Sequence, residues 1–196
     1  MLSSNRLAAL STRWEAVGAP ILGHLRPGLL DTELDDLSAP LPFVLPQELR
    51  TWWSWHDGVS SIDVSRSDER NIGPFWPFQP LAECVAQYAE WRALSREFEA
   101  NGDPVWFKAG WLPLSSEFPL AILVCDCSGG ALAPTPILRL TPPEGQQPPA
   151  PICKSMDELV ERWVIAIDRG LWRCEDSSWK PCPERLPPGW PLNGVA

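Results

Sequence analysis

The stretch at residues 45–58, which reads LPQELRTWWSWHDG, constrains the fold of this chain more than any other. Pro46 suits a first helical position, where no N–H donor is needed, and Gly58 suits the end of a helix. Between them, apolar side chains recur at helical spacing on one face, and an enclosed indole buries roughly 150–250 Å². The stretch therefore predicts a central core helix over residues 46–57, whose inward face carries Leu45, Leu49, Trp52, Trp53 and His56.

The composition is that of one acidic globular domain. A chain of 196 residues can bury a core without disulfides, and its 44% hydrophobic and 21% charged content is ordinary. Its 12 Trp and 23 Pro are both well above the usual share. The net charge of −9 argues against direct binding of nucleic acid or of an anionic membrane, since both recruit clustered Lys and Arg. We therefore expect a protein partner, and a basic one.

The sequence contains neither an export signal nor a dense disulfide framework, and we therefore expect a cytoplasmic protein. Residues 1–6 begin no long apolar segment, and nowhere do about 18 apolar residues run together, so the sequence predicts neither export nor a membrane span. The six cysteines show no dense disulfide framework. We expect reduced thiols, and among oligomeric states we favour a monomer.

Local signals predict four further helices and several strands. The most specific signal is the capping box of Ser155 and Glu158, which begins an apolar helix that ends at Gly170. The run 120–125 is apolar on both faces, which favours a central strand, although its pattern also fits a buried helix segment. The other expected helices run from Ser3 or Ser4 to Gly18, from Asp31 or Thr32 to Pro40, and over residues 81–98. The other strand-like pieces cover residues 105–107, 110–114 and 137–140.

The remaining segments are predicted to be irregular. Residues 59–71 are polar and form a solvated loop, while prolines restrict residues 72–78 to an edge strand or an irregular one. Residues 141–151 are rich in proline and form a hairpin excursion. Residues 172–196 show no periodicity, so we expect a Trp- and Pro-rich tail that packs on or trails from a domain at residues 1–171.

Taken in order, the pieces contain Trp14, Ala19-Pro20, Leu25-Arg26-Pro27-Gly28, Glu33-Leu34, Leu45-Pro46, Glu48-Leu49-Arg50, Trp53, His56-Asp57-Gly58, Gly110-Trp111-Leu112-Pro113, a strand ending at Cys125-Asp126, and a Ser155-led helix. This order, over roughly residues 10–171, resembles the SUKH superfamily. That superfamily includes yeast cell-wall assembly regulators of the Smi/Knr type and many bacterial immunity proteins. Residues 115–119 depart from it, because the family often has a Gly-rich polar turn before the central strand.

The resemblance implies an α+β single domain, in which helices pack on a mostly antiparallel sheet. It also implies an immunity protein, since bacterial members usually bind and neutralise a toxin deployed between competing cells, often a nuclease. It implies no cofactor and no reaction. The alternative is a regulatory or scaffold protein of the same fold, of the cell-wall assembly type, that binds a partner other than a toxin.

The residues themselves do not favour catalysis. His56 and Asp57 would point about 100° apart on a helix, which favours a core-edge histidine and a backbone-binding carboxylate over an acid–base pair. His24 is the only other histidine. Cys125 and Cys127 share one strand face but lack two further ligands at zinc spacing. We expect no metal and no enzyme. The rival hypothesis is an enzyme built on His56, Asp57 and Asp126.

Aromatic and acidic side chains outside the core faces are the candidates for binding a partner. Trp55 lies off the main face of its helix beside Glu48, and Trp76 lies on an irregular segment, although both also suit a role in covering the core. Asp126 ends an apolar strand, where a carboxylate needs a polar neighbour, so structural pairing and recognition are equally open. The candidate residues are Trp55, Asp57, Asp63, Glu69, Trp76 and Asp126.

Overall fold

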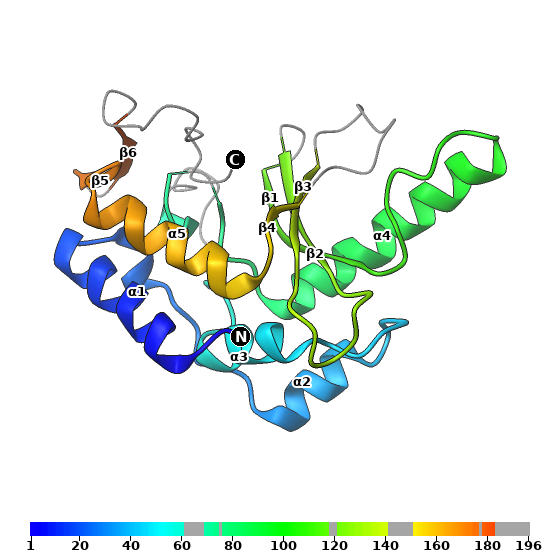
Figure 1. Cartoon of the computed structure of the whole chain (residues 1–196), viewed down its shortest axis with the longest axis horizontal. Helices are drawn as coiled ribbons and strands as arrows, with labels where there is room; N and C mark the ends of the chain where they lie inside the picture. The colour runs from blue at the N-terminus through cyan, green and yellow to red at the C-terminus, as the bar shows by residue number, and fades with distance from the viewer. Residues whose placement is uncertain (61–68, 75, 118–120, 141–150, 177, 183–196) are drawn as a thin grey trace.

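The computed structural model describes residues 1–60, 69–74, 76–117, 121–140, 151–176 and 178–182 (Figure 1). These residues form an α+β domain with five α-helices, a four-stranded sheet and a two-stranded hairpin. The helices are α1 (Ser4–Val17), α2 (Asp31–Ser38), α3 (Gln47–Trp55), α4 (Leu81–Ala100) and α5 (Met156–Asp168), with a 3-10 turn, η1 (Pro20–Gly23), after α1. The strands are β1 (Trp111–Glu117), β2 (Ala121–Asp126), β3 (Ile137–Leu140), β4 (Pro151–Cys153), β5 (Trp172–Glu175) and β6 (Ser178–Pro181).

Strand β2 is a central strand of the larger sheet. The strand order is β1-β2-β3-β4, and each adjacent pair is antiparallel. Successive side chains of β2 alternate between the two faces of the sheet, yet all four from Ile122 to Cys125 are buried. The prediction of a central strand, covered on both faces, is therefore confirmed. Strands β3 and β4 flank the proline-rich segment, of which residues 141–150 lie outside the described part.

The predicted starts of α1 and α5 are confirmed by their capping hydrogen bonds. The Ser3 hydroxyl accepts a hydrogen bond from the Arg6 N–H, and the Ser155 hydroxyl accepts one from the Glu158 N–H. The Glu158 carboxylate reaches back and accepts a hydrogen bond from the Lys154 N–H, which lowers the pKa of Glu158. Both helix starts are thus set by residues within four positions of one another, which explains why the sequence alone reveals them.

Helix α3 ends two residues earlier than the sequence predicts. Its last residue is Trp55, and His56 already has an extended backbone with φ −149° and ψ 137°. Gly58 follows with φ +69°, and a Cβ atom at this position would lie 2.4 Å from the Pro80 nitrogen. The chain leaves the helix early because the next residues, Asp57 and Gly58, pack against the start of α4.

The segment at residues 105–107, expected to be strand-like, is not a strand. Phe107 is buried, and the Trp106 ring lies 6.3 Å from the Trp91 ring of α4. Trp106 and Phe107 therefore pack against Trp91 of α4, without any strand pairing.

The first part of the C-terminal segment is ordered against the domain. Residues 172–182 contain the β5–β6 hairpin, and both Trp172 and Trp179 are buried. The Trp179 indole N–H donates a hydrogen bond to the Asn71 carbonyl. Residues 183–196, which include the remaining tryptophan of the segment, lie outside the described part.

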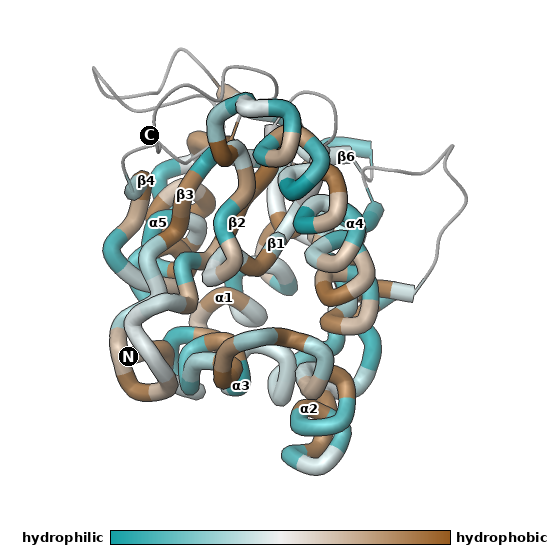
Figure 2. Tube along the Cα trace, turned by 90° about the vertical axis from the view of Figure 1, so that its right-hand side faces the viewer, coloured by the Kyte–Doolittle hydropathy of each residue, from teal (hydrophilic) through white to brown (hydrophobic). Residues whose placement is uncertain are grey.

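Helix α3 lies at the centre of an aromatic core, as the sequence predicts. Trp52 and Trp53 are fully buried, and the Trp52 ring lies 4.5 Å from the Phe78 ring and 6.0 Å from the Trp163 ring of α5. Figure 1 shows α1 and α5 side by side on one flank and α4 on the other, against β1. Figure 2 shows α2 and α3 below the apolar strands. Within the described residues, no helix combines the length and the apolar character needed to cross a bilayer.

Candidate interaction surface

Trp55 and Trp76 both cover the core. The Trp55 ring stacks on the Trp14 ring at 5.5 Å and lies 5.4 Å from the Trp52 ring, which leaves it half-buried. Trp76 is 1% exposed, and its segment folds back on itself through the hydrogen bond from the Ile72 N–H to the Trp76 carbonyl. The exposed position considered for Trp76 is therefore wrong, and the alternative role in covering the core is the observed one.

Asp57 caps helix α4. The carboxylate is 1% exposed; its Oδ1 accepts a hydrogen bond of 2.9 Å from the Leu81 N–H, and its Oδ2 lies 3.0 Å from Arg26 Nη2. Helix α4 follows Pro80, which has no capping side chain, so Asp57 supplies the missing acceptor from another part of the chain. Burial raises the pKa of Asp57, although the Leu81 hydrogen bond and Arg26 oppose the shift. This arrangement leaves Asp57 inaccessible to a partner.

The side chains of His56 and Asp57 contact different groups of Arg26. His56 Nδ1 lies 2.9 Å from the Arg26 carbonyl oxygen, whereas the Asp57 carboxylate contacts the Arg26 side chain. The histidine is half-buried, and so lies at the edge of the core. Each side chain thus fixes the segment around Arg26 to the end of α3.

Glu69 and Asp126 also make local contacts within the domain. Glu69 Oε2 lies 2.9 Å from His24 Nε2. Asp126 Oδ1 accepts hydrogen bonds from the Ser128 N–H and hydroxyl, so it stabilises the turn after β2. Asp63 lies outside the described residues.

The described candidate residues do not form one surface. Asp57 and Glu69 contact Arg26 and His24, whereas Trp55 packs on Trp14 and Trp52, and Asp126 makes its contacts in the turn after β2. In the described part of the chain, no group of three or more His, Cys, Asp or Glu side chains is arranged to hold a metal ion. The sequence-based candidates therefore do not by themselves define a binding site.

Glu48 is a buried polar residue whose role the sequence did not reveal. Its side chain is 2% exposed, and its two oxygens accept hydrogen bonds from the N–H groups of Leu2 (3.0 Å), Thr135 (2.9 Å) and Met156 (3.1 Å). The amino group of Met1 lies 3.6 Å away. Glu48 thus ties the N-terminal segment, the loop before β3 and the start of α5 to α3.

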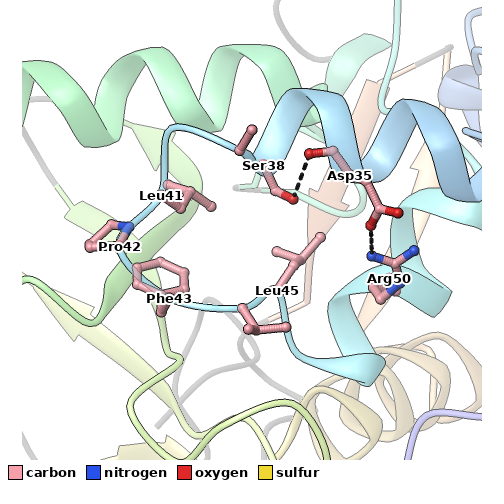
Figure 3. A pocket seen from close by; sticks show the side chains of 9 residues that line it. Asp35, Ser38, Leu41, Pro42, Phe43, Leu45 and Arg50 are labelled. Atoms are coloured by element: carbon pink, nitrogen blue, oxygen red, sulfur yellow. Dashed lines mark hydrogen bonds and ion pairs between the residues drawn. The ribbon is translucent and has the colours of Figure 1, made fainter.

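A cavity of about 460 Å³ opens between α2, the connection at residues 39–46 and the start of α3 (Figure 3). Its apolar wall comes from the run Leu-Pro-Phe-Val-Leu at residues 41–45, in which Leu45 is buried and Val44 is 66% exposed. Phe43 packs edge-on against Tyr88 of α4, with ring centroids 5.8 Å apart. The lining residues are Asp35, Ser38, Ala39, Leu41, Pro42, Phe43, Val44, Leu45 and Arg50.

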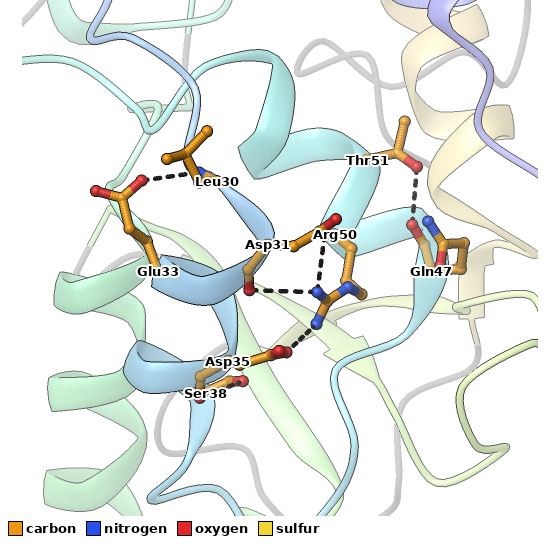
Figure 4. Close-up of polar contacts among 8 residues, drawn as sticks. All are labelled: Leu30, Asp31, Glu33, Asp35, Ser38, Gln47, Arg50 and Thr51. Atoms are coloured by element: carbon orange, nitrogen blue, oxygen red, sulfur yellow. Dashed lines mark hydrogen bonds and ion pairs between the residues drawn. The ribbon is translucent and has the colours of Figure 1, made fainter.

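Asp35 and Ser38 of α2, with Arg50 of α3, form the polar side of this cavity. Arg50 lies 2.9 Å from Asp31 and 2.6 Å from Asp35, and these hydrogen bonds raise the pKa of the guanidinium (Figure 4). The two aspartates stay exposed, with side-chain accessibilities of 85% and 68%. Glu33 accepts a hydrogen bond from the Leu30 N–H, while Asp36 is exposed on the same helix. Two of the four carboxylates of α2, those of Asp31 and Asp35, therefore face Arg50.

The loop between β2 and β3 adjoins this region. The Gln47 N–H donates a hydrogen bond of 2.8 Å to the Ala131 carbonyl, and the next residue, Leu132, is 78% exposed. We call the open cavity and its acidic border the α2 surface, defined by Asp31, Asp35, Asp36, Pro42 and Val44. It combines a concave apolar wall with negative charge, which suits a basic protein partner that inserts an apolar side chain.

Only one half of the α2 surface, its acidic helix, has a signal in the sequence. The outward Glu33, Asp35 and Asp36 were visible from the helical period of α2, whereas the run 41–45 shows no period and lies between prolines. Only the folded structure shows that residues 41–45 lie next to α2 and that Val44 stays outside the core.

Comparison with known proteins gives no family assignment. No model of a known protein family matches the chain, and no curated protein sequence matches it. The SUKH resemblance therefore enters the function only as part of a proposal.

Proposed function

We propose that this chain is an immunity protein of the SUKH type, which binds a cognate bacterial toxin stoichiometrically and thereby neutralises it. The observation that carries the proposal is the α2 surface, where an open apolar cavity borders an acidic helix. The motif order supports the family, and the net charge of −9 favours a basic toxin such as a nuclease. The proposal includes a cytoplasmic location and requires neither a cofactor nor a reaction.

The apolar wall would supply the binding energy of such a complex. An aromatic or aliphatic side chain of the toxin would enter the cavity and cover Val44, which the free protein leaves exposed to water. Anchors of this kind dominate interface energies when they are enclosed and desolvated.

The carboxylates of α2 would act mainly on encounter and orientation. Arg50 holds Asp31 and Asp35 in position without covering them, so a Lys or Arg of the toxin can approach both. Opposite charges at the border of an interface raise the association rate and disfavour wrong partners. Binding should therefore weaken as salt increases.

The direct test is to co-purify the protein with the product of the neighbouring reading frame and to measure stoichiometry by calorimetry. We expect a one-to-one complex and protection of cells that express the toxin. Val44→Arg should weaken binding at least about tenfold, equivalent to about 1.4 kcal/mol, because it fills the cavity with positive charge. Ala8→Arg, on an exposed position of α1, adds the same charge elsewhere and should leave affinity unchanged.

Three outcomes would count against the proposal. The absence of both a complex and protection would reject the immunity function. A complex with a host protein, formed without any toxin, would favour the alternative of a regulatory or scaffold protein. Equal weakening by Val44→Arg and Ala8→Arg would show that the toxin does not bind the α2 surface.

A further inference from the structure

The C-terminal half of α4 projects beyond the sheet (Figure 1). It presents apolar side chains to water. Leu94 and Phe98 are each 41% exposed, and since they are four residues apart they lie on one helical face. Val105, in the segment that returns from the helix, is 50% exposed. We call these three residues the α4 patch.

The segment that returns from the helix is fixed to it. The Asp103 N–H donates a hydrogen bond to the Phe98 carbonyl, and the Phe107 N–H donates one to the Ser95 hydroxyl. The Arg92 guanidinium adds a hydrogen bond to the Phe107 carbonyl. These hydrogen bonds hold the α4 patch in one conformation, which limits the conformational entropy that the protein loses when a partner binds.

The charges around the α4 patch are acidic. Glu90 and Glu97 stand four residues before and three residues after Leu94, so they lie on the same exposed face. Within the described part of the chain, neither glutamate makes an ion pair, whereas Arg92 pairs with Glu99. The remaining cation, Arg96, is two residues from Leu94 and so points about 200° away around the helix.

We propose that the α4 patch docks a basic amphipathic helix of a partner protein, with apolar side chains at i and i+4 flanked by Lys or Arg. Charge complementarity selects this occupant: two exposed glutamates, which make no ion pair with the described residues, border one side of an apolar stripe of matching helical spacing. A second copy of the chain, joined through the same face, would bring Glu90 and Glu97 against their own equivalents. An anionic membrane would be repelled by the same charges.

The inference does not depend on the proposed function. The α4 patch lies near the projecting C-terminal end of α4, whereas the α2 surface adjoins Tyr88, nearer the start of that helix. It can therefore be tested with a synthetic probe and no toxin.

The probe is an amphipathic peptide of leucine and lysine, about fourteen residues long and so about four helical turns. A matched peptide carries glutamate in place of lysine, and a third carries the same leucines and lysines in scrambled order. Binding is measured by fluorescence anisotropy, and the site is mapped by backbone amide shifts of the labelled full-length protein. We expect shifts centred on residues 90–105, saturable binding of the first peptide, and at least tenfold weaker binding of the other two.

Variants of the protein separate specific docking from general attraction. Phe98→Ser should weaken binding at least tenfold, whereas Leu132→Ser, at an exposed leucine in another loop, should not change it. The double change Glu90→Lys and Glu97→Lys should transfer the preference to the glutamate peptide, while Glu15→Lys on α1 should not. These residues are exposed, and retained cooperative unfolding confirms that each variant folds.

Specific results would overturn the inference. Amide shifts confined to α2 would place the peptide on the α2 surface and not on the α4 patch. Equal binding of the ordered and scrambled peptides would show general electrostatic attraction. A dimer of the free protein that dissociates on Phe98→Ser would assign the α4 patch to a second copy of the chain. Binding to phosphatidylserine vesicles that Phe98→Ser abolishes would assign it to a membrane.

Discussion

The carboxylates at the two ends of α3 differ from those on α2 and α4 in what surrounds them. Glu48 and Asp57 are almost fully buried, and each accepts the N–H of the first residue of a distant helix, Met156 for α5 and Leu81 for α4. The N-terminal end of a helix carries partial positive charge, so a carboxylate there is stabilised. The α2 carboxylates of Asp31 and Asp35 also link two helices, through Arg50 of α3, but they do so at the surface and stay exposed. The same chemical group therefore assembles the domain at α3 and remains available to a partner elsewhere.

This comparison separates the acidic residues that serve folding from those that could serve recognition. A buried carboxylate with several N–H donors is costly to remove because its donors are left without acceptors. An exposed carboxylate loses only weak, screened interactions. Substitution of a buried carboxylate should therefore lower the free energy of unfolding more than it lowers the affinity for a partner. Substitution of an exposed carboxylate should do the reverse.

The largest effect is expected at Glu48. Glu48→Ala leaves the buried N–H groups of Leu2, Thr135 and Met156 without their acceptor, so the free energy of unfolding should fall by about 3–5 kcal/mol. Urea unfolding followed by tryptophan fluorescence measures the change.

Two matched variants control this experiment. Glu48→Gln keeps an acceptor oxygen and should cost less than Glu48→Ala, whereas Gln47→Ala changes the exposed neighbour on the same helix and should cost little. If Glu48→Ala costs no more than Gln47→Ala, Glu48 does not hold these elements together.

A smaller effect, with a distinct pH dependence, is expected at Asp57. Asp57→Asn replaces a charged acceptor of the Leu81 N–H and the partner of Arg26, so it should cost about 1–3 kcal/mol near pH 7. Burial raises the pKa of Asp57 in the folded protein above that in the unfolded chain. The stability gained from the higher proton affinity is present below the unfolded pKa, near 3.9, and is lost as pH rises through the folded pKa.

The measurement is the difference in unfolding free energy between the parent protein and Asp57→Asn at several pH values upward from about pH 4. The advantage of the parent protein should shrink with rising pH, because ionisation of the buried carboxyl costs the folded state more than the unfolded one. An advantage that grows with pH would mean that Arg26 and the Leu81 hydrogen bond outweigh burial.

The fold could be predicted from the sequence wherever the deciding signal was local. The Ser3 and Ser155 caps, and the apolar run of β2, lie within a few residues of the elements they specify. The end of α3 was placed too late because Asp57 leaves the helix to reach Leu81, 24 residues further along.

The same reasoning explains what was missed at the candidate surface. The role of Glu48 was not visible in the sequence because two of its hydrogen-bond donors, the N–H groups of Thr135 and Met156, are 87 and 108 residues away in the chain. The sequence left Trp76 open between an interface and a role in covering the core, and its burial is seen only in the folded structure. The charge of α2 was visible from its period, but the cavity beside it depends on how residues 39–46 fold.

The smallest effect on stability is expected at Asp36, on the exposed side of α2. The residue lies near the C-terminal end of that helix, where negative charge opposes the helix dipole, and the chain already carries a net charge of −9. Asp36→Asn should therefore leave the free energy of unfolding within about 0.5 kcal/mol of the parent value, on the stabilising side. If the proposed function holds, Asp36→Asn should nevertheless slow association with the cognate toxin at low salt, measured by stopped-flow fluorescence, with little change in the dissociation rate. A loss of more than about 1 kcal/mol in stability would place Asp36 with Glu48 and Asp57 among the carboxylates that hold the fold. An unchanged association rate would remove it from the recognition surface.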